Sequence, residues 1–409
     1  MVKIVGKKPS NSWWDKLRRK IGISGPKRQT NPVDRQFFLL IAGLLLFGVV
    51  MVYNSSVVTA FQEFDDKFYF AKLQAMWALI GFVAMLVTAR IPYHWWRIYA
   101  KPMLYGTIGL LILVLIPGIT NPIYGARRWI SIGELTLQPA ELAKFVLVIY
   151  LASALSGANH SGSGIHLKLP TRITPPGWVK SGMGKINISQ LLFRVALVLG
   201  LVIIEPDLGT SLVLAGTALV IYWISGAPLK QFITLIGTGL VAVLGLILSS
   251  SYRAERLKTF FDPMKDPLGT SYHIRQVLIA LGSGGWLGLG LGQSRQKYAY
   301  LPEVTTDSIF AVIGEEIGFL GASVVLVVFL GLIIKGLRIA NRCPDPFGKL
   351  LATGMIAWVG IQAVINFSAM VVLVPLTGVP LPFISYGGSS LVVALASMGI
   401  ILNISKHSK

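Results

Sequence analysis

Long apolar segments recur along the chain from residue 37 to its end, and shorter polar segments separate them. Most of these segments approach the roughly 20 apolar residues that an α-helix needs to cross a bilayer, and they are too long and continuous for barrel strands. The pattern therefore predicts an all-α polytopic membrane protein with about ten transmembrane helices. We place the spans near residues 37–60, 69–89, 102–118, 138–156, 189–204, 210–224, 232–250, 307–334, 350–373 and 387–404.

This pattern divides the chain into three regions. Residues 1–36 form a basic tail, residues 37–404 the ten-span membrane domain, and residues 405–409 a short C-terminus. The longest segment between spans, about 251–306, comes before the eighth span. We expect no cleavable signal peptide, because the first apolar run begins too far along the chain and is too long.

Charged residues are few and unevenly placed. They make up 13% of the chain, with a net charge of +20, whereas soluble domains carry about 25%. With ten spans, basic residues fall in the tail and in alternate loops, and nearly all acidic residues fall in the others. The positive-inside rule then predicts cytoplasmic termini, an extracytoplasmic 251–306 loop and a place in the cytoplasmic (inner) membrane. Because topology accounts for the basic residues, we expect no nucleic-acid partner.

Signals for a cofactor are few. Cys343 is the single cysteine and the five histidines are scattered, so no set has the spacing of metal ligands. The sequence has no phosphate-binding loop and no dinucleotide fingerprint in a strand–helix setting. We expect no nucleotide, haem or flavin.

The segment 298–321, YAYLPEVTTDSIFAVIGEEIGFLG, leads from a polar stretch into a membrane helix. Thr305 or Thr306 is expected to cap the helix, which places Asp307 in the first turn, where the helix dipole favours an anion. A carboxylate at the mouth of a buried helix is a candidate base. Gly314 and Gly318 then form a G-x-x-x-G pattern that lets another helix approach. The alternative is a helix cap with packing glycines and no chemical role.

Two basic motifs stand at the ends of other spans. In GARRWIS, Arg127 and Arg128 beside a tryptophan suit a lipid diphosphate, or ordinary anchoring at the membrane interface. In QPAELAK, Glu141 and Lys144 lie three residues apart on one predicted helix and should face each other. This pair is either functional or a structural ion pair at the helix mouth.

Two further motifs are rich in turn-forming residues. In EPDLGTS, Asp207 is favoured as a helix cap, with a role in holding a cation or a basic partner as the alternative. Residues 375–390 carry three prolines and paired glycines, so this backbone must be buried in protein or line a cavity. A nucleophilic role for Ser385 is not expected, because no Ser/His/Asp set accompanies it.

Together these motifs resemble the SEDS family (shape, elongation, division and sporulation), polytopic peptidoglycan glycosyltransferases typified by FtsW and RodA. The resemblance covers about residues 35–405, and the details of its motifs look closer to FtsW. In family order the motifs are GARRWIS (125–131), QPAELAK (138–144), EPDLGTS (205–211), LPEVTTDSIFAVIGEE (301–316) and PLPFISYGGSS (380–390). Thr305 departs from the family pattern, where His is frequent, and Glu205 stands where Gln is usual.

The resemblance implies polymerisation of lipid II, an undecaprenyl-diphosphate disaccharide-pentapeptide, into β-1,4 glycan strands at the outer membrane face. It implies that Asp307 is the catalytic residue. It also implies that the partners are a class B penicillin-binding protein transpeptidase and other division proteins. From the resemblance and the residues together we expect a substrate-binding set of Arg127, Arg128, Glu141, Lys144, Asp207, Glu303 and Ser385.

The α-linked diphosphate of lipid II and the β-linked product require inversion, for which Asp307 would act as the base. The leaving diphosphate needs positive charge, from basic residues or from a divalent cation, Mg²⁺ or Mn²⁺. Three alternatives stay open: a lipid II flippase, a non-catalytic scaffold for the transpeptidase, and a role in elongation instead of division. A flippase would place charged residues along a path to the cytoplasmic side.

Overall fold

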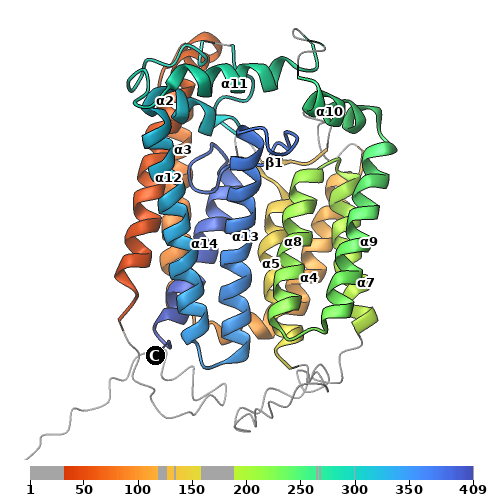
Figure 1. Cartoon of the computed structure of the whole chain (residues 1–409). Helices are drawn as coiled ribbons and strands as arrows, with labels where there is room; N and C mark the ends of the chain where they lie inside the picture. Colours follow the sequence, from red (N-terminus) through yellow and green to blue (C-terminus); the bar gives the residue numbers. More distant parts are fainter. Residues whose placement is uncertain are drawn as a thin grey trace, which may run out of the picture.

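The computed structural model of the chain describes residues 32–117, 127–132, 135–157, 188–263, 266, 269–298 and 300–408. Ten of its helices lie where the sequence predicts spans, and they form an upright bundle (Figure 1). These are α2 (Arg35–Phe64), α3 (Tyr69–Arg90), α4 (His94–Leu115), α5 (Pro139–Leu155), α7 (Ile188–Ile204), α8 (Leu208–Ile224), α9 (Leu229–Leu248), α12 (Ile309–Arg342), α13 (Pro346–Met370) and α14 (Gly388–Ser405).

Seven of these helices are long and apolar enough to cross a membrane, namely α2, α3, α4, α9, α12, α13 and α14. The apolar helices α7 and α8 have 17 residues each, and α5 has 17 residues that include Glu141 and Lys144. The predicted all-helical membrane class is confirmed by this fold. The count of ten spans, the orientation and the three-region division stay predictions.

The segment predicted as a loop before the eighth span contains two helices, α10 (Ser251–Phe261) and α11 (Tyr272–Gly284). Both lie across one end of the bundle (Figure 1). In α11 the buried positions Ile274, Val277 and Ala280 recur every three residues, so one apolar face packs inward. A small antiparallel hairpin, β1 (Ile130–Ile132) and β2 (Leu135–Leu137), precedes α5.

The two described ends of the chain meet at the opposite end of the bundle (Figure 1). The Asp34 N–H donates to Ser405 Oγ at 3.2 Å, and Lys335 Nζ lies 3.1 Å from the Asp34 carboxylate. An even number of crossings places the two ends on one side in this way.

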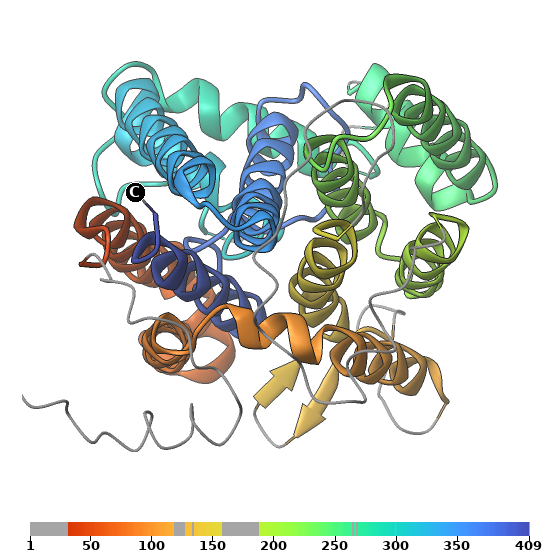
Figure 2. The same cartoon turned by 90° about the horizontal axis from the view of Figure 1, so that it is seen from below.

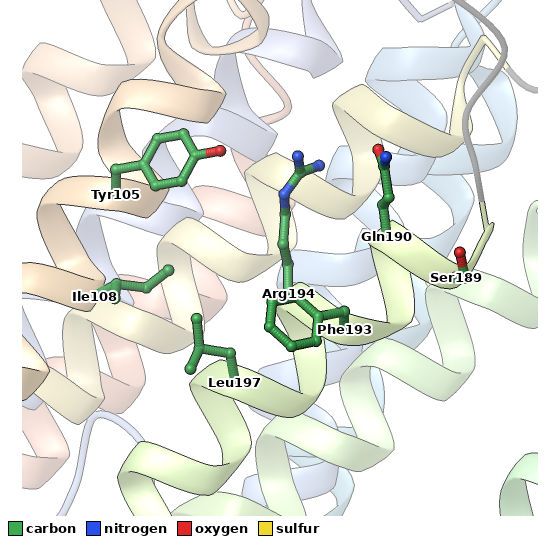
Figure 3. A pocket seen from close by; sticks show the side chains of 7 residues that line it. All are labelled: Tyr105, Ile108, Ser189, Gln190, Phe193, Arg194 and Leu197. Atoms are coloured by element: carbon green, nitrogen blue, oxygen red, sulfur yellow. The ribbon is translucent and has the colours of Figure 1, made fainter.

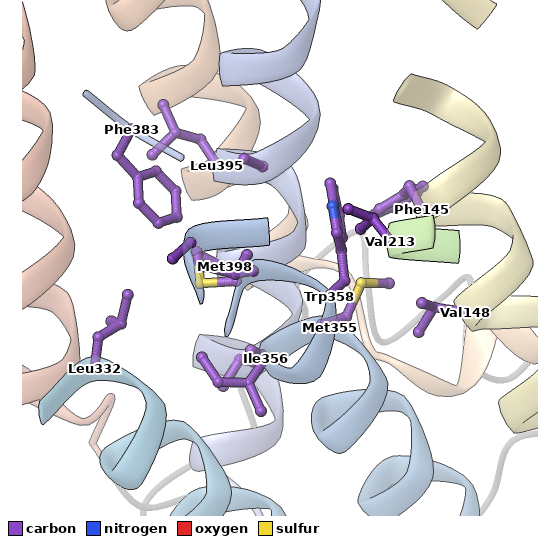
Figure 4. Packing of buried hydrophobic residues seen from close by; sticks show 14 of the residues in the cluster. Phe145, Val148, Val213, Leu332, Met355, Ile356, Trp358, Phe383, Leu395 and Met398 are labelled. Atoms are coloured by element: carbon purple, nitrogen blue, oxygen red, sulfur yellow. The ribbon is translucent and has the colours of Figure 1, made fainter. Parts of the chain in front are cut away.

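The core centres on α13 and α14, whereas α9 lies at the edge, as the view along the bundle shows (Figure 2). In the most apolar 18-residue stretches of α13 and α14, 78% and 83% of the residues are buried, whereas none are buried in that of α9. Met355, Ile356 and Trp358 of α13 pack against side chains from several surrounding helices (Figure 4). The buried polar side chains of α13, Thr353, Gln362 and Asn366, therefore contact protein.

Candidate active site

Asp307 lies immediately before α12 and not inside it. The helix begins at Ile309 with Ser308 at the cap position, so the prediction of Asp307 in the first turn is wrong. The predicted cap by Thr305 or Thr306 is wrong as well. Glu303 has a left-handed backbone (φ 50°), and the turn folds Thr306 back so that its Oγ1 lies 2.8 Å from Glu303 Oε2 and 3.3 Å from Asp307 Oδ1. Two carboxylates thus share one hydroxyl group.

The surroundings of Asp307 make its carboxylate more basic than usual. The residue is 8% exposed. Burial, followed by the negative charge of Glu303, raises the pKa of Asp307 to about 6, although Thr306 and the positive charge of Arg256 act in the opposite direction. At neutral pH the group is ionised and can still accept a proton readily, as a general base must.

One face of α13 holds the backbone around Asp307. Asn366 Nδ2 donates to the carbonyl oxygens of Asp307 at 2.8 Å and Val379 at 2.9 Å. One turn earlier, Gln362 Nε2 donates to the Pro380 carbonyl at 2.9 Å. The proline-rich segment before α14 is mostly buried in protein over residues 379–385, whereas residues 375–378 are half-buried or exposed, and it forms one wall beside Asp307.

Ser385 fastens this wall to the start of α12. Its Oγ donates to the Thr306 carbonyl at 2.5 Å and accepts from the Leu381 N–H at 2.8 Å. The Tyr386 N–H also donates to the Thr305 carbonyl at 2.8 Å. Ser385 thus positions the backbone next to Asp307, and its predicted place in the substrate-binding set stays a prediction.

Glu141 and Lys144 face each other on α5, as their spacing predicts. Lys144 Nζ lies 2.8 Å from Glu141 Oε1, and both residues are 2% exposed. Lys144 also donates to Gln362 Oε1 at 2.8 Å and lies 5.3 Å from the centre of the Trp358 ring. Because Gln362 precedes Asn366 by one helical turn, this ion pair and the Asp307 backbone are held by the same face of α13.

Asp207 caps α8, as predicted. Its Oδ1 accepts from the Thr210 N–H at 2.9 Å, and its Oδ2 accepts from Gln138 Nε2 at 3.1 Å. Gln138 also donates its backbone N–H to Ser389 Oγ at 3.3 Å. The cap therefore connects the EPDLGTS turn to α5 and to the start of α14.

Arg128 holds the same turn from the hairpin side. Its Nε and Nη2 donate to the carbonyl oxygens of Glu205 and Pro206, each at 2.7 Å. Glu205 is fully buried, and burial with the nearby Asp207 charge raises its pKa to about 8, against a smaller opposing effect of Arg128. Arg127 is half-buried and makes no side-chain hydrogen bond or ion pair within the described residues.

Arg256 and His273 belong to the same neighbourhood, and the sequence analysis did not single them out. Arg256 Nη1 donates to the Leu376 carbonyl at 3.0 Å, and its charge lowers the pKa of both Asp307 and His273. His273 Nε2 lies 2.7 Å from Ser308 Oγ, and burial lowers the pKa of His273 to about 4, so the ring is neutral. The amphipathic pattern of α10 and α11 was the signal that could have indicated that this segment packs on the bundle.

The described residues contain no group of three or more His, Cys, Asp or Glu side chains that could hold a metal ion. Mg²⁺ is commonly held by one or two carboxylates together with substrate phosphates. The exposed carboxylate of Glu303 beside the site fits that second arrangement, so a divalent cation stays a proposal that involves the substrate.

The fold and the site define a polytopic helical membrane protein in which two buried carboxylates with raised pKa values, Asp307 and Glu205, lie at ends of bundle helices. The family model of FtsW, RodA and SpoVE, described as a cell cycle protein, matches residues 35–409. The chain belongs to this family, and the resemblance inferred from the motifs is confirmed.

Named relatives and a solved structure agree with this assignment. The chain is 38% identical to stage V sporulation protein E of Bacillus subtilis (strain 168), covering 93% of this chain and 99% of the relative. It is 40% identical to the probable peptidoglycan glycosyltransferase FtsW of Trichlorobacter lovleyi (strain ATCC BAA-1151 / DSM 17278 / SZ), covering 92% and 94%. A solved chain from "Structural coordination of polymerization and crosslinking by a peptidoglycan synthase complex" superposes with a TM-score of 0.71 at 25% identity, covering 91% and 97%.

Proposed function

We propose that this protein is a peptidoglycan glycosyltransferase that polymerises lipid II at the outer face of the cytoplasmic membrane, in cell division. Family membership and the names of several relatives support the enzyme class and favour division. The observation that carries the catalytic assignment is the buried Asp307, whose pKa of about 6 suits a base at neutral pH.

In the proposed reaction, the 4-hydroxyl oxygen of the acceptor sugar attacks the anomeric carbon of the donor. The bond from that carbon to the diphosphate breaks, its electron pair leaves with undecaprenyl diphosphate, and Asp307 takes the hydroxyl proton. Attack opposite the leaving group converts the α-linkage into a β-linkage, so one base is sufficient for an inverting transfer.

The diphosphate needs positive charge as it leaves. The contacts of Lys144 with Glu141 and Gln362 favour a role in which it positions α13 and the wall beside Asp307. We propose instead that Arg256, whose positive charge also acts on Asp307, neutralises the leaving diphosphate. Arg127 would supply a second positive charge. A divalent cation bound to the diphosphate would add a further Lewis acid there.

Three of the charged residues that a flippase path could use, Lys72, Glu315 and Glu316, are bonded within the protein. A fourth, Arg194, donates to the Tyr150 hydroxyl and makes no ion pair within the described residues. Lys72 lies 2.7 Å from Asp66 at the protein surface. Glu316 is nearly fully buried and lies 3.3 Å from Lys297, and Glu315 accepts the Arg295 N–H at 3.0 Å. These contacts favour the enzyme over the transporter.

The partner we propose is a class B penicillin-binding protein transpeptidase, within a larger set of division proteins. Support comes from the solved chain named above, which belongs to a complex that couples polymerisation to crosslinking.

The division role is tested by depletion of the protein, which should give filamentous cells. Rounded cells that still divide would indicate an elongation role instead.

The decisive test is lipid II polymerisation by the purified protein with its transpeptidase partner and Mg²⁺ or Mn²⁺. We expect glycan ladders from the wild type, none from Asp307→Asn, and normal ladders from Asp262→Asn, a matched change at an exposed aspartate after α10. Equal ladders from Asp307→Asn would remove this residue from the mechanism. A folded, partner-bound wild type without ladders would favour the scaffold.

A further inference from the structure

A cavity of about 630 Å³ lies between α4 and α7, away from Asp307. Its lining combines a charged and polar part with an apolar part, and the residues are Tyr105, Ile108, Ser189, Gln190, Phe193, Arg194 and Leu197. Figure 3 shows the Arg194 guanidinium between the Tyr105 hydroxyl and the Gln190 amide, with Ile108 and Leu197 on the other side of the cavity. The cavity is therefore amphipathic along its length.

Arg194 lies near the level at which lipid headgroups are expected. It follows the first residue of α7 by six positions, a rise of about 9 Å, and α7 begins at the end of the bundle opposite α10 and α11 (Figure 1). Side chains on a helix point back toward its N-terminus, and arginine extends its charge toward the interface. The guanidinium can therefore reach lipid phosphates.

The charge of Arg194 lacks a carboxylate partner within the described residues. Its Nη1 donates to the Tyr150 hydroxyl at 2.7 Å, and it lies 5.8 Å from the centre of that ring. A guanidinium carries five N–H donors, and an unpaired cation in a membrane helix is costly. An anion from outside the chain would balance it.

We propose that this cavity binds an anionic phospholipid of the leaflet that faces the start of α7. Arg194, Tyr105 and Gln190 contact the headgroup phosphate, and an acyl chain lies along Ile108, Leu197 and the exposed Phe193. The cavity volume falls within the range of small-molecule sites, and its charge and apolar lining match the two parts of a lipid. This proposal is independent of the glycosyltransferase reaction.

The test is native mass spectrometry of the delipidated full chain titrated with phosphatidylglycerol, with phosphatidylcholine and dioleoylglycerol as comparison lipids. We expect one phosphatidylglycerol to bind preferentially. Arg194→Gln should weaken this binding by about five- to tenfold, the usual contribution of one basic residue. Arg338→Gln, a matched change at an exposed arginine near the C-terminal end of α12, should leave it unchanged.

A second variant tests the acyl-chain half without altering charge. Ile108→Trp should fill the apolar part and also weaken phosphatidylglycerol binding, and it serves as the test if Arg194→Gln fails to fold. Inorganic phosphate should not displace the lipid. Unchanged phosphatidylglycerol binding by folded variants, equal binding of phosphatidylcholine, or displacement by inorganic phosphate would each overturn the proposal.

Discussion

At the scale of single residues, the basicity of Asp307 arises from its surroundings and not from a chemical partner. Burial disfavours the charged form, and the nearby Glu303 carboxylate disfavours it further. Among the side chains that the structure describes, only the shared Thr306 hydroxyl donates to its oxygens, in addition to the residue's own backbone. Asp307 is thus free to accept a substrate proton.

The first prediction concerns the pH dependence of polymerisation. The base is active as a carboxylate, so the rate should fall as the pH drops through about 6, the pKa of Asp307. Initial rates between about pH 5 and 8 measure this acidic limb. A limb near pH 4, the range of an ordinary aspartate, would contradict the proposed surroundings of the base.

Glu303→Gln gives the second prediction. Removing its negative charge removes one of the causes that raise the pKa of Asp307, so the acidic limb should move to lower pH. Asp262→Asn, at an exposed position, is the control and should leave the limb in place. An unmoved limb in Glu303→Gln would show that the two carboxylates do not interact.

Glu205 gives a third prediction, on stability. Its folded pKa of about 8 lies above that of the unfolded chain, so the folded state must retain a proton or bury a charge as the pH rises. Stability is therefore lost between the unfolded and folded pKa values. Glu205→Gln should therefore stabilise the protein more at pH 9 than at pH 5. The gain in unfolding free energy, followed through the melting temperature, should be larger at pH 9 by at least about 1 kcal/mol. An equal effect at both pH values would contradict the raised pKa.

At the scale of elements, α12 is interrupted by the backbone of Gly318, which has a φ of 68°. The glycine-rich segment that follows α11 packs against this break. The N–H groups of Leu289 and Gly290 donate to the carbonyl oxygens of Glu315 and Glu316, each at 3.0 Å. A helix break inside a membrane protein leaves backbone groups without partners, and here the preceding loop supplies them.

The fourth prediction tests this packing. Gly288 has a φ of 82°, and a Cβ there would lie 2.1 Å from the Glu316 carbonyl oxygen. Gly288→Ala should therefore lower the free energy of unfolding by about 2–3 kcal/mol. The matched control is Gly282→Ala, in α11, where a Cβ meets nothing within 4 Å. Thermal unfolding in detergent compares the two, and equal melting temperatures would contradict the close approach.

At the scale of the whole molecule, α13 joins segments that are far apart in the chain. Gln362 contacts Lys144 and the Pro380 carbonyl, and Asn366 contacts the carbonyls of Asp307 and Val379. Both residues are nearly fully buried, so their bonds are shielded from water. The position of the base therefore depends on contacts between α5, α12, α13 and the segment before α14.

The fifth prediction follows from this arrangement. Asn366→Ala removes both bonds and should lower kcat by about tenfold or more, because Asp307 loses its fixed position, with a smaller change in KM. It should also destabilise the fold by about 1–3 kcal/mol. Asn341→Ala, at an exposed position at the end of α12, is the control. Unchanged kcat in folded Asn366→Ala would show that α13 does not position the base.

The sequence by itself determined the membrane class, the approximate places of the ten bundle helices, the family and the pairing of Glu141 with Lys144. These features depend on apolar run length, helical spacing and local motifs, all of which are readable along the chain. Only the tertiary structure decided that Asp307 precedes α12, because the turn at Glu303 and the contact with Asn366 outweigh local capping preferences. It also decided that Arg256 and His273 lie beside Asp307, and that Arg128 holds the turn at Glu205. Such contacts join residues distant in sequence, and packing, which no local pattern records, brings them together.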